Sequence, residues 1–117
     1  MMQKARALLR RWRKRLNLDP FWQIEVEPAT GCLGSVRYDH HRCEALVKLA
    51  PDLGENLERV VVHELLELLL WELGVLYEDL LESHVREPGS REALRLSHAA
   101  ARNRLIERLI PALLGEQ

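Results

Sequence analysis

The run LERVVVHELLELLLWELGVL, residues 57–76, constrains the fold more than any other part of the chain. Apolar residues fill most of its positions, and the period of an α-helix gathers the polar ones into a stripe that contains His63 and Glu67. We therefore predict a long, largely buried helix over 57–76, which Gly74 bends or ends. A polar stripe on such a helix is most simply its solvent-facing side, and a metal site is the alternative interpretation.

The segment HELLE, residues 63–67, contains the first half of the zinc-peptidase motif HExxH, with Glu67 in place of the second histidine. Residues four apart lie one above the other on a helix, so His63 and Glu67 can share one metal ion. Carboxylate oxygen and imidazole nitrogen bind zinc at similar distances, and zinc is therefore the cofactor that we predict. In HExxH enzymes the glutamate after the first histidine takes a proton from metal-bound water. We expect Glu64 to have this catalytic role.

A catalytic zinc ion usually has a third protein ligand, and this chain offers several. The candidates after the motif are His84, His98, Glu82 and Glu107. We predict His98, because helical spacing places it on the same stripe of the last helix as Leu94 and Leu105. Two histidines and one carboxylate form a known ligand set of catalytic zinc.

The remaining segments predict one α+β domain over residues 1–117. Residues 1–16 have the pattern of a basic amphipathic helix, and 21–50 read as three antiparallel strands with alternating buried positions. Residues 90–114 form the predicted C-terminal helix. The expected architecture is therefore a helix, a three-stranded antiparallel sheet, the long helix and a last helix.

Charge is distributed unevenly along the chain. Residues 1–16 contain seven basic side chains and no acidic one, whereas the rest of the chain contains ten basic and eighteen acidic side chains. A basic cluster can bind phosphate groups, but the acidic remainder and the lack of a recognition motif argue against a nucleic-acid partner. We expect the arginines to neutralise the acidic part of the protein.

The cysteines and the apolar runs predict a cytoplasmic protein. Cys32 and Cys43 would lie at opposite ends of the predicted hairpin, too far apart for a disulfide, which fits a reducing compartment. The N-terminal segment has no continuous apolar core, and Glu67 and Glu72 interrupt the longest apolar run. We therefore expect neither a signal peptide nor a membrane span.

The hairpin tip carries a second group of metal-binding residue types, His40, His41 and Cys43. A tetrahedral zinc site needs four suitably placed ligands, which this turn does not supply. A solvated turn is therefore the favoured interpretation.

The runs WQIEVEP, GSVRYD, CEALVKLAPDL and ERVVVHELLELLL resemble the small zincin-like proteins of phages and bacteria, which are similar in pattern to minimal gluzincins and SprT-like domains. In these proteins a basic amphipathic helix precedes a strand with the pattern WxIxV, two further strands follow, and the active-site helix reads VHELLH. The resemblance covers about Leu8 to Leu76. It implies a zincin-like fold, a zinc ligand at His63, a general base at Glu64 and a peptide or protein substrate.

Two positions depart from the family pattern. Glu67 replaces the second histidine, and the last helix has Asn103 where the family tends to carry an acid, with Glu107 one turn later. Two functions are therefore open. One is a small zinc-dependent metallopeptidase, and the other is a catalytically inactive zincin-like protein that acts as an interaction module for a protein partner.

Overall fold

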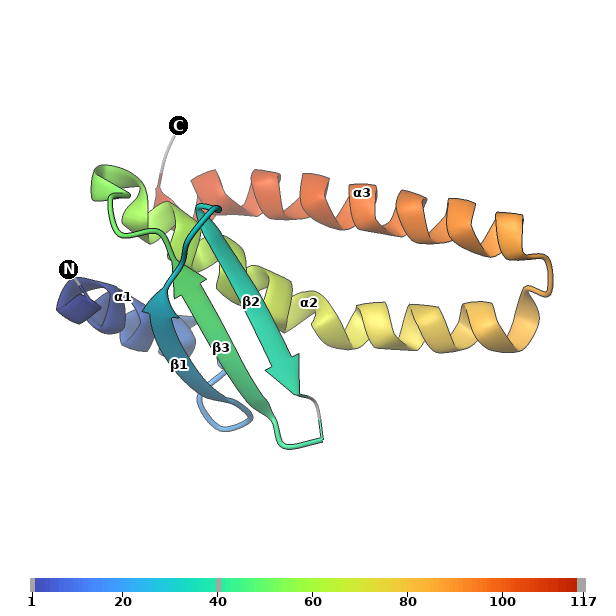
Figure 1. Cartoon of the computed structure of the whole chain (residues 1–117), viewed down its shortest axis with the longest axis horizontal. Helices are drawn as coiled ribbons and strands as arrows, with labels where there is room; N and C mark the ends of the chain where they lie inside the picture. Colours follow the sequence, from blue (N-terminus) through green and yellow to red (C-terminus); the bar gives the residue numbers. More distant parts are fainter. Residues whose placement is uncertain (1, 40, 116–117) are drawn as a thin grey trace. The chain divides into compact units, whose positions relative to one another are not determined.

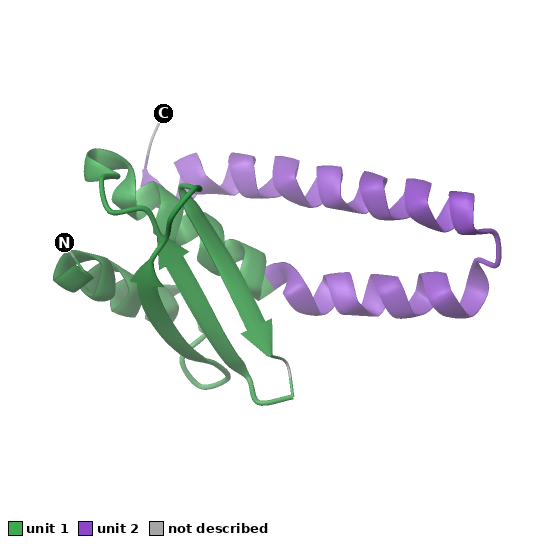
Figure 2. Cartoon of the chain, viewed as in Figure 1, with its two compact units in different colours: residues 1–69 green, residues 70–117 purple. Residues whose placement is uncertain are grey.

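The computed structural model describes residues 2–39 and 41–115 and has the predicted α+β class (Figure 1). Its elements in chain order are α1 (Met2–Arg15), β1 (Gln23–Pro28), β2 (Gly34–Asp39), β3 (Glu44–Leu49), the short 3-10 helix η1 (Gly54–Asn56), α2 (Leu57–His84) and α3 (Pro88–Leu114). The chain forms two compact units, residues 1–69 and 70–117, and α2 runs from the first into the second (Figure 2).

The sheet is mixed, so the prediction of an antiparallel sheet is wrong. The strand order is β1-β3-β2, with β1 parallel and β2 antiparallel to β3. The last strand occupies the centre because it buries the most apolar surface, with Ala45, Val47 and Leu49 all buried. The first strand ends in Pro28, which has no N–H to donate and is therefore suited to an edge.

One face of the sheet forms the core of the first unit. In β1 the buried Ile24 and Val26 alternate with exposed glutamates, as the sequence predicted. The apolar stripes of α1 and α2 lie on this inner face and contribute Ala5, Leu9, Trp12, Val61, Val62 and Leu65, which are all buried. Glu58 joins the two helices, because it accepts a hydrogen bond from Trp12 Nε1 over 3.1 Å and pairs with Arg11.

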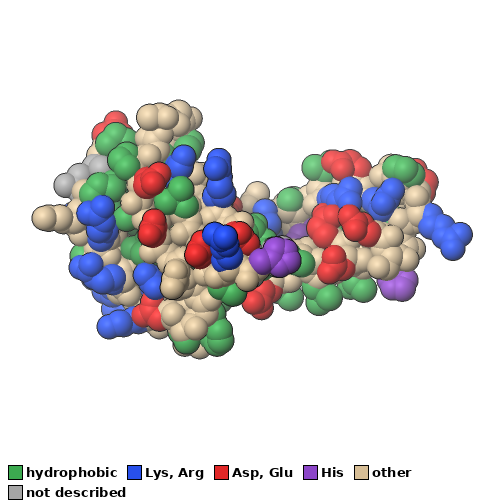
Figure 3. Space-filling view, turned by 60° about the horizontal axis from the view of Figure 1, so that its bottom comes forward, with side chains coloured by type: hydrophobic (Ala, Val, Ile, Leu, Met, Phe, Trp, Pro, Cys, Tyr) green, Lys and Arg blue, Asp and Glu red, His purple; other side chains and the backbone are tan. Residues whose placement is uncertain are grey.

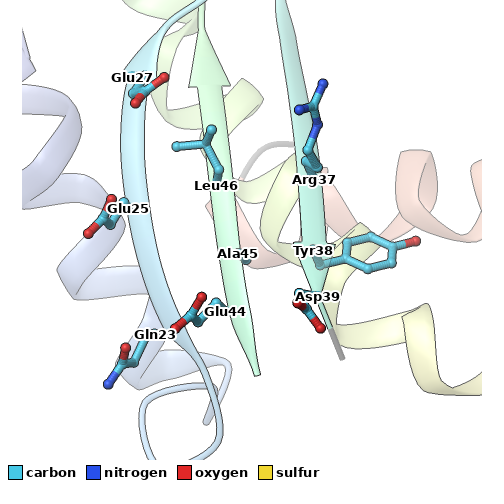
Figure 4. A pocket seen from close by; sticks show the side chains of 9 residues that line it. All are labelled: Gln23, Glu25, Glu27, Arg37, Tyr38, Asp39, Glu44, Ala45 and Leu46. Atoms are coloured by element: carbon cyan, nitrogen blue, oxygen red, sulfur yellow. The ribbon is translucent and has the colours of Figure 1, made fainter. Parts of the chain in front are cut away.

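The outer face of the sheet is polar and open. Side chains from all three strands project from it around a shallow hollow of about 390 Å³, among them Glu25, Glu44 and Arg37 (Figure 4). Leu46 is the apolar residue at its centre. Charged side chains on this face stay hydrated, so the core lies on the helix side alone.

The second unit is a helical hairpin built from the end of α2 and from α3. Tyr77 donates a hydrogen bond to the carbonyl of Leu94 over 3.2 Å, and Arg95 Nε donates to both carboxylate oxygens of Glu78 over 2.8 and 2.7 Å. The helix α2 extends beyond the predicted end at residue 76 to His84. Glycine in a helix costs only about 1 kcal/mol, and strong helix formers surround Gly74, so the helix continues through it.

The last helix begins slightly earlier than predicted, at Pro88. Glu87 caps it, since its carboxylate accepts hydrogen bonds from the N–H groups of Gly89 and Ser90 over 3.1 and 3.0 Å. Proline at the first helical position lacks an N–H that would have no partner there. The helix passes through Pro111 and ends before Gly115, whose φ of 73° is left-handed.

Two sequence expectations can be compared directly with the structure. Cys32 and Cys43 form no disulfide, as predicted, and both thiols are exposed. Among the described residues no helix combines the length and the apolar character that crossing a bilayer requires. Cytoplasmic localisation stays a prediction.

Two glycines give a matched test of the packing. At Gly34 an added Cβ would lie 2.6 Å from Val60 Cγ1, and a β-branched side chain on a helix has little freedom to move away. We expect Gly34→Ala to destabilise the protein by about 1–3 kcal/mol. At Gly74 the nearest atom would be 3.9 Å away, and we expect Gly74→Ala to stabilise it by about 0.5–1 kcal/mol. Thermal unfolding of both variants measures the effects, and a higher Tm for Gly34→Ala would contradict this packing.

Candidate metal centre

Three side chains of the HELLE segment form one group on α2. Ligand atoms of His63, Glu64 and Glu67 all lie within 4.8 Å of one another. The four-residue spacing brings His63 and Glu67 to one side of the helix, where both are half-buried. Glu64 follows His63 directly, and its Oε1 lies 3.5 Å from His63 Nδ1.

Glu64 is the buried member of this group. Only 5% of the residue is exposed, and its Oε2 has no hydrogen-bond partner among the described residues. Strand β2 passes over it at Gly34, where an added Cβ would lie 3.2 Å from Glu64 Oε1. A buried carboxylate is costly, because burial removes the water that would stabilise its charge.

Burial also changes the acid–base chemistry of Glu64. Loss of hydration raises its pKa from 4.5 to about 8, and the negative charge of Glu67 and a hydrogen bond with the Glu67 side chain add to the increase. At neutral pH the metal-free protein therefore holds a proton on Glu64. The buried carboxyl group and its half-buried neighbour Glu67 together favour a positive charge at this position.

The donor atoms fit a divalent metal ion. One imidazole nitrogen and carboxylate oxygens are ligands that zinc accepts, and a cation held among them would offset the cost of burying Glu64. His63, Glu64 and Glu67 could therefore hold a metal ion. Glu64 is close enough to act as a ligand itself, whereas the sequence motif indicated only a general base.

His98, the predicted third ligand, lies on α3 in the second unit. Its ring stacks on Tyr77, with the ring centroids 4.4 Å apart and the planes at 15°. Leu94 and Leu105, which were expected to share a buried stripe with it, are partly exposed. The group that the structure brings together lies in the first unit alone, and the assignment of His98 as a ligand stays a prediction.

The hairpin tip shows a polar turn in its described part. Asp39 Oδ1 accepts hydrogen bonds from the N–H groups of His41 and Arg42 over 3.0 and 3.4 Å, and Cys43 is a free, exposed thiol. This arrangement is an Asx-type turn, in which the aspartate replaces a backbone acceptor. His40 lies outside the described residues.

Sequence reasoning missed one residue of the site, Gly34. It lines the site with backbone alone, and its position allows β2 to approach α2 at Val60 and Glu64. The available signal was a glycine at the start of a strand, which often marks the close approach of another group. The group that would approach it could not be read from the same pattern.

Comparison with family models, curated proteins and solved structures gave no match to this chain. Membership of the zincin-like family stays a prediction from the resemblance of the sequence segments.

The raised pKa of Glu64 predicts an unusual dependence of stability on pH. The unfolded carboxyl group loses its proton near pH 4.5, whereas the folded one keeps it until about pH 8. The free energy of unfolding of metal-free protein should therefore fall between these two values, by a few kcal/mol at about 1.4 kcal/mol per unit of pKa. Glu64→Gln should remove this fall, because glutamine does not titrate.

Denaturant unfolding from pH 4.5 to 8.5 in the presence of a chelator measures this difference. Glu72→Gln is the matched control, because Glu72 is an exposed glutamate of the same helix. It should retain the wild-type pH dependence. Equal slopes for wild type and Glu64→Gln would show that Glu64 titrates normally.

Proposed function

We propose that this protein is a small zinc-dependent hydrolase of the zincin-like type, acting on peptides or proteins. The observation that carries the proposal is the group of His63, Glu64 and Glu67, whose ligand atoms all lie within 4.8 Å of one another and which contains a buried carboxyl group. Buried carboxyl groups are uncommon in protein cores, because the charged form loses its hydration there. Functional sites are where such a group is expected.

The residues have distinct roles in this proposal. His63 and Glu67 are the ligands from the first unit, and His98 is the proposed third ligand. Zinc bound there would polarise the substrate carbonyl and lower the pKa of a bound water. Glu64 accepts the proton of the attacking water and passes it to the nitrogen that leaves when the peptide bond breaks.

The open edge of the sheet next to this group supports a peptide substrate. The N–H of Ala50 donates to the carbonyl of Leu33 over 2.9 Å, so the antiparallel register directs alternate residues of β2 toward β3. The backbone groups of Gly34, Val36 and Tyr38 consequently face outward. An extended peptide that paired with this edge would pass beside Glu64, because Gly34 lies against it.

Glu67 should make this site a weaker activator of water than one with two histidines on the helix. A carboxylate transfers negative charge to the metal ion, so the ion withdraws less charge from a bound water.

A non-catalytic interaction module is the second candidate, and one observation favours it. Leu73, Leu76 and Leu80 recur at helical spacing on α2 and are 60%, 56% and 49% exposed. Neighbouring exposed leucines are a feature of surfaces that bind another protein. In this case the fold would be kept without turnover.

Metal stoichiometry separates the two candidates. We expect about one zinc ion per chain in wild-type protein that has been stripped and then equilibrated with zinc, since a catalytic centre holds one ion. His63→Ala should lose the ion, and His98→Ala should lower the affinity about 10–100-fold or more if His98 is a ligand. His84→Ala is the control, because His84 is an exposed histidine at the end of α2. Elemental analysis and a competing chelator provide the measurements.

Turnover is tested on an unfolded protein such as fluorescently labelled casein. Glu64→Gln should retain zinc but lose at least about 100-fold in activity, the usual contribution of a general base. Zinc binding without cleavage that depends on Glu64 would favour the interaction module. Wild-type protein that binds no zinc would overturn the hydrolase.

A further inference from the structure

The edge of the sheet far from the HELLE group also carries backbone groups that could bind another chain. Gln23 and Ala29 donate their N–H groups to the carbonyls of Cys43 and Leu49 over 2.9 and 2.8 Å. In a parallel pair this register directs the odd-numbered residues of β1 toward β3. The N–H and C=O groups of Ile24 and Val26 therefore face the open side, while their side chains are buried.

Three arginines of α1 lie along this open edge. Arg6, Arg10 and Arg13 form one wall of a groove of about 540 Å³, and β1 forms the other. They share one side of the helix because they are four and three residues apart. An arginine of this helix can reach the backbone at this edge, because Arg13 Nη2 donates a hydrogen bond to the carbonyl of Trp22 over 3.2 Å.

The other two arginines differ from Arg13 in their contacts. Arg13 lies 2.7 Å from Asp19, whereas neither Arg6 nor Arg10 has an ion-pair or hydrogen-bond partner among the described residues. Basic side chains gather at one end of the first unit in the space-filling view, with acidic side chains beside them (Figure 3). The groove thus combines unused backbone donors and acceptors with unneutralised positive charge.

We propose that this groove binds an extended segment of a partner protein, which adds as a fourth strand to β1 and directs acidic side chains toward α1. Backbone pairing with Ile24 and Val26 would provide affinity, and pairing of acids with Arg6 and Arg10 would provide selectivity. The side chains of an added strand alternate between the two faces. The acids therefore occupy every second position, and neutral or basic residues lie beside the exposed Glu25 and Glu27.

Charge argues against two other occupants. A second copy that paired through its own β1 would place Glu25 and Glu27 beside the same residues of its neighbour, and like charges across strands are destabilising. Nucleic acid would bring phosphates against these two glutamates and would leave the backbone groups of Ile24 and Val26 unused. An acidic extended peptide can pair with the backbone of β1 and place its carboxylates beside the arginines of α1.

The proposal does not depend on the metal centre, since the groove lies on β1 and the HELLE group lies next to β2 at the other edge of the sheet. The probe is the peptide acetyl-Thr-Glu-Val-Glu-Val-Glu-Thr-amide, added to the full chain carrying His63→Ala. The readout is amide hydrogen exchange by NMR. Exchange at Ile24 and Val26 should slow about tenfold or more on saturation, because their N–H groups become hydrogen-bonded.

Charge-matched variants test the role of the arginines. Arg6→Glu with Arg10→Glu should weaken binding at least about tenfold, or more than about 1.4 kcal/mol. Lys4→Glu with Lys14→Glu makes the same change in net charge at exposed positions of α1 outside the groove. At physiological salt, where charges are screened beyond about 8 Å, this control should bind nearly as well as the parent protein.

Two modified peptides complete the test. A peptide of the same composition in the order Thr-Glu-Glu-Val-Val-Glu-Thr cannot place all its acids on one face and should bind more weakly. The N–H groups of the probe's glutamates face β1 in an antiparallel pair and those of its valines face β1 in a parallel pair, so N-methylation of one of these two sets, and not of the other, should weaken binding.

Five results would overturn the proposal. The first is binding of the peptide without protection of Ile24 and Val26, and the second is an equal loss of affinity in the two double variants. The third is protection at Val36 instead, which would indicate binding at the β2 edge. The fourth is protection that increases with protein concentration in the absence of peptide, which would indicate a second copy. Fifth, a single-stranded oligonucleotide that competes through the same arginines without backbone protection would instead identify an electrostatic site for nucleic acid.

Discussion

The packing of α2 against the inner face of the sheet is the constraint on which the other features of the first unit depend. Val47 and Leu49 in the central strand and Val61 and Leu65 in the helix are completely removed from solvent. Their burial provides the main driving force for this unit. The close approach that it requires is possible because β2 begins with Gly34, which has no side chain to hold the helix away. Glu64 is buried as a consequence.

A carboxylate in this position reduces the stability of the fold. An apolar side chain of similar volume would fill the same space without the desolvation that raises the pKa of Glu64. Sequences usually agree with their fold at every level, and the positions where they do not are commonly functional. The proposed metal ion would reduce this conflict, because its positive charge beside Glu64 would favour the ionised carboxylate that a general base requires.

The mixed sheet gives the two edges different surroundings. The edge at β2 lies next to the HELLE group, and the edge at β1 lies along the arginines of α1. An antiparallel meander in sequence order would have placed β2 in the centre, where its backbone would be fully paired. The observed order leaves β2 open beside the candidate site, and it leaves β1 open with a proline at its end. The proposed metal centre and the proposed peptide-binding groove therefore lie at separate edges of one small sheet.

The sequence by itself determined the helices, the strands and the meeting of His63 with Glu67 in the candidate metal-binding group. Periodicity and local spacing encode these features, because His63 and Glu67 meet through the geometry of one helix. It did not determine the strand order, the contact between Gly34 and Glu64, or the open groove beside Arg6 and Arg10. These features depend on which elements far apart in the chain come together, and the strand pattern is the same whether a neighbour is parallel or antiparallel. Tertiary packing made that choice, because β3 gains more from burial at the centre of the sheet than either of the other strands does.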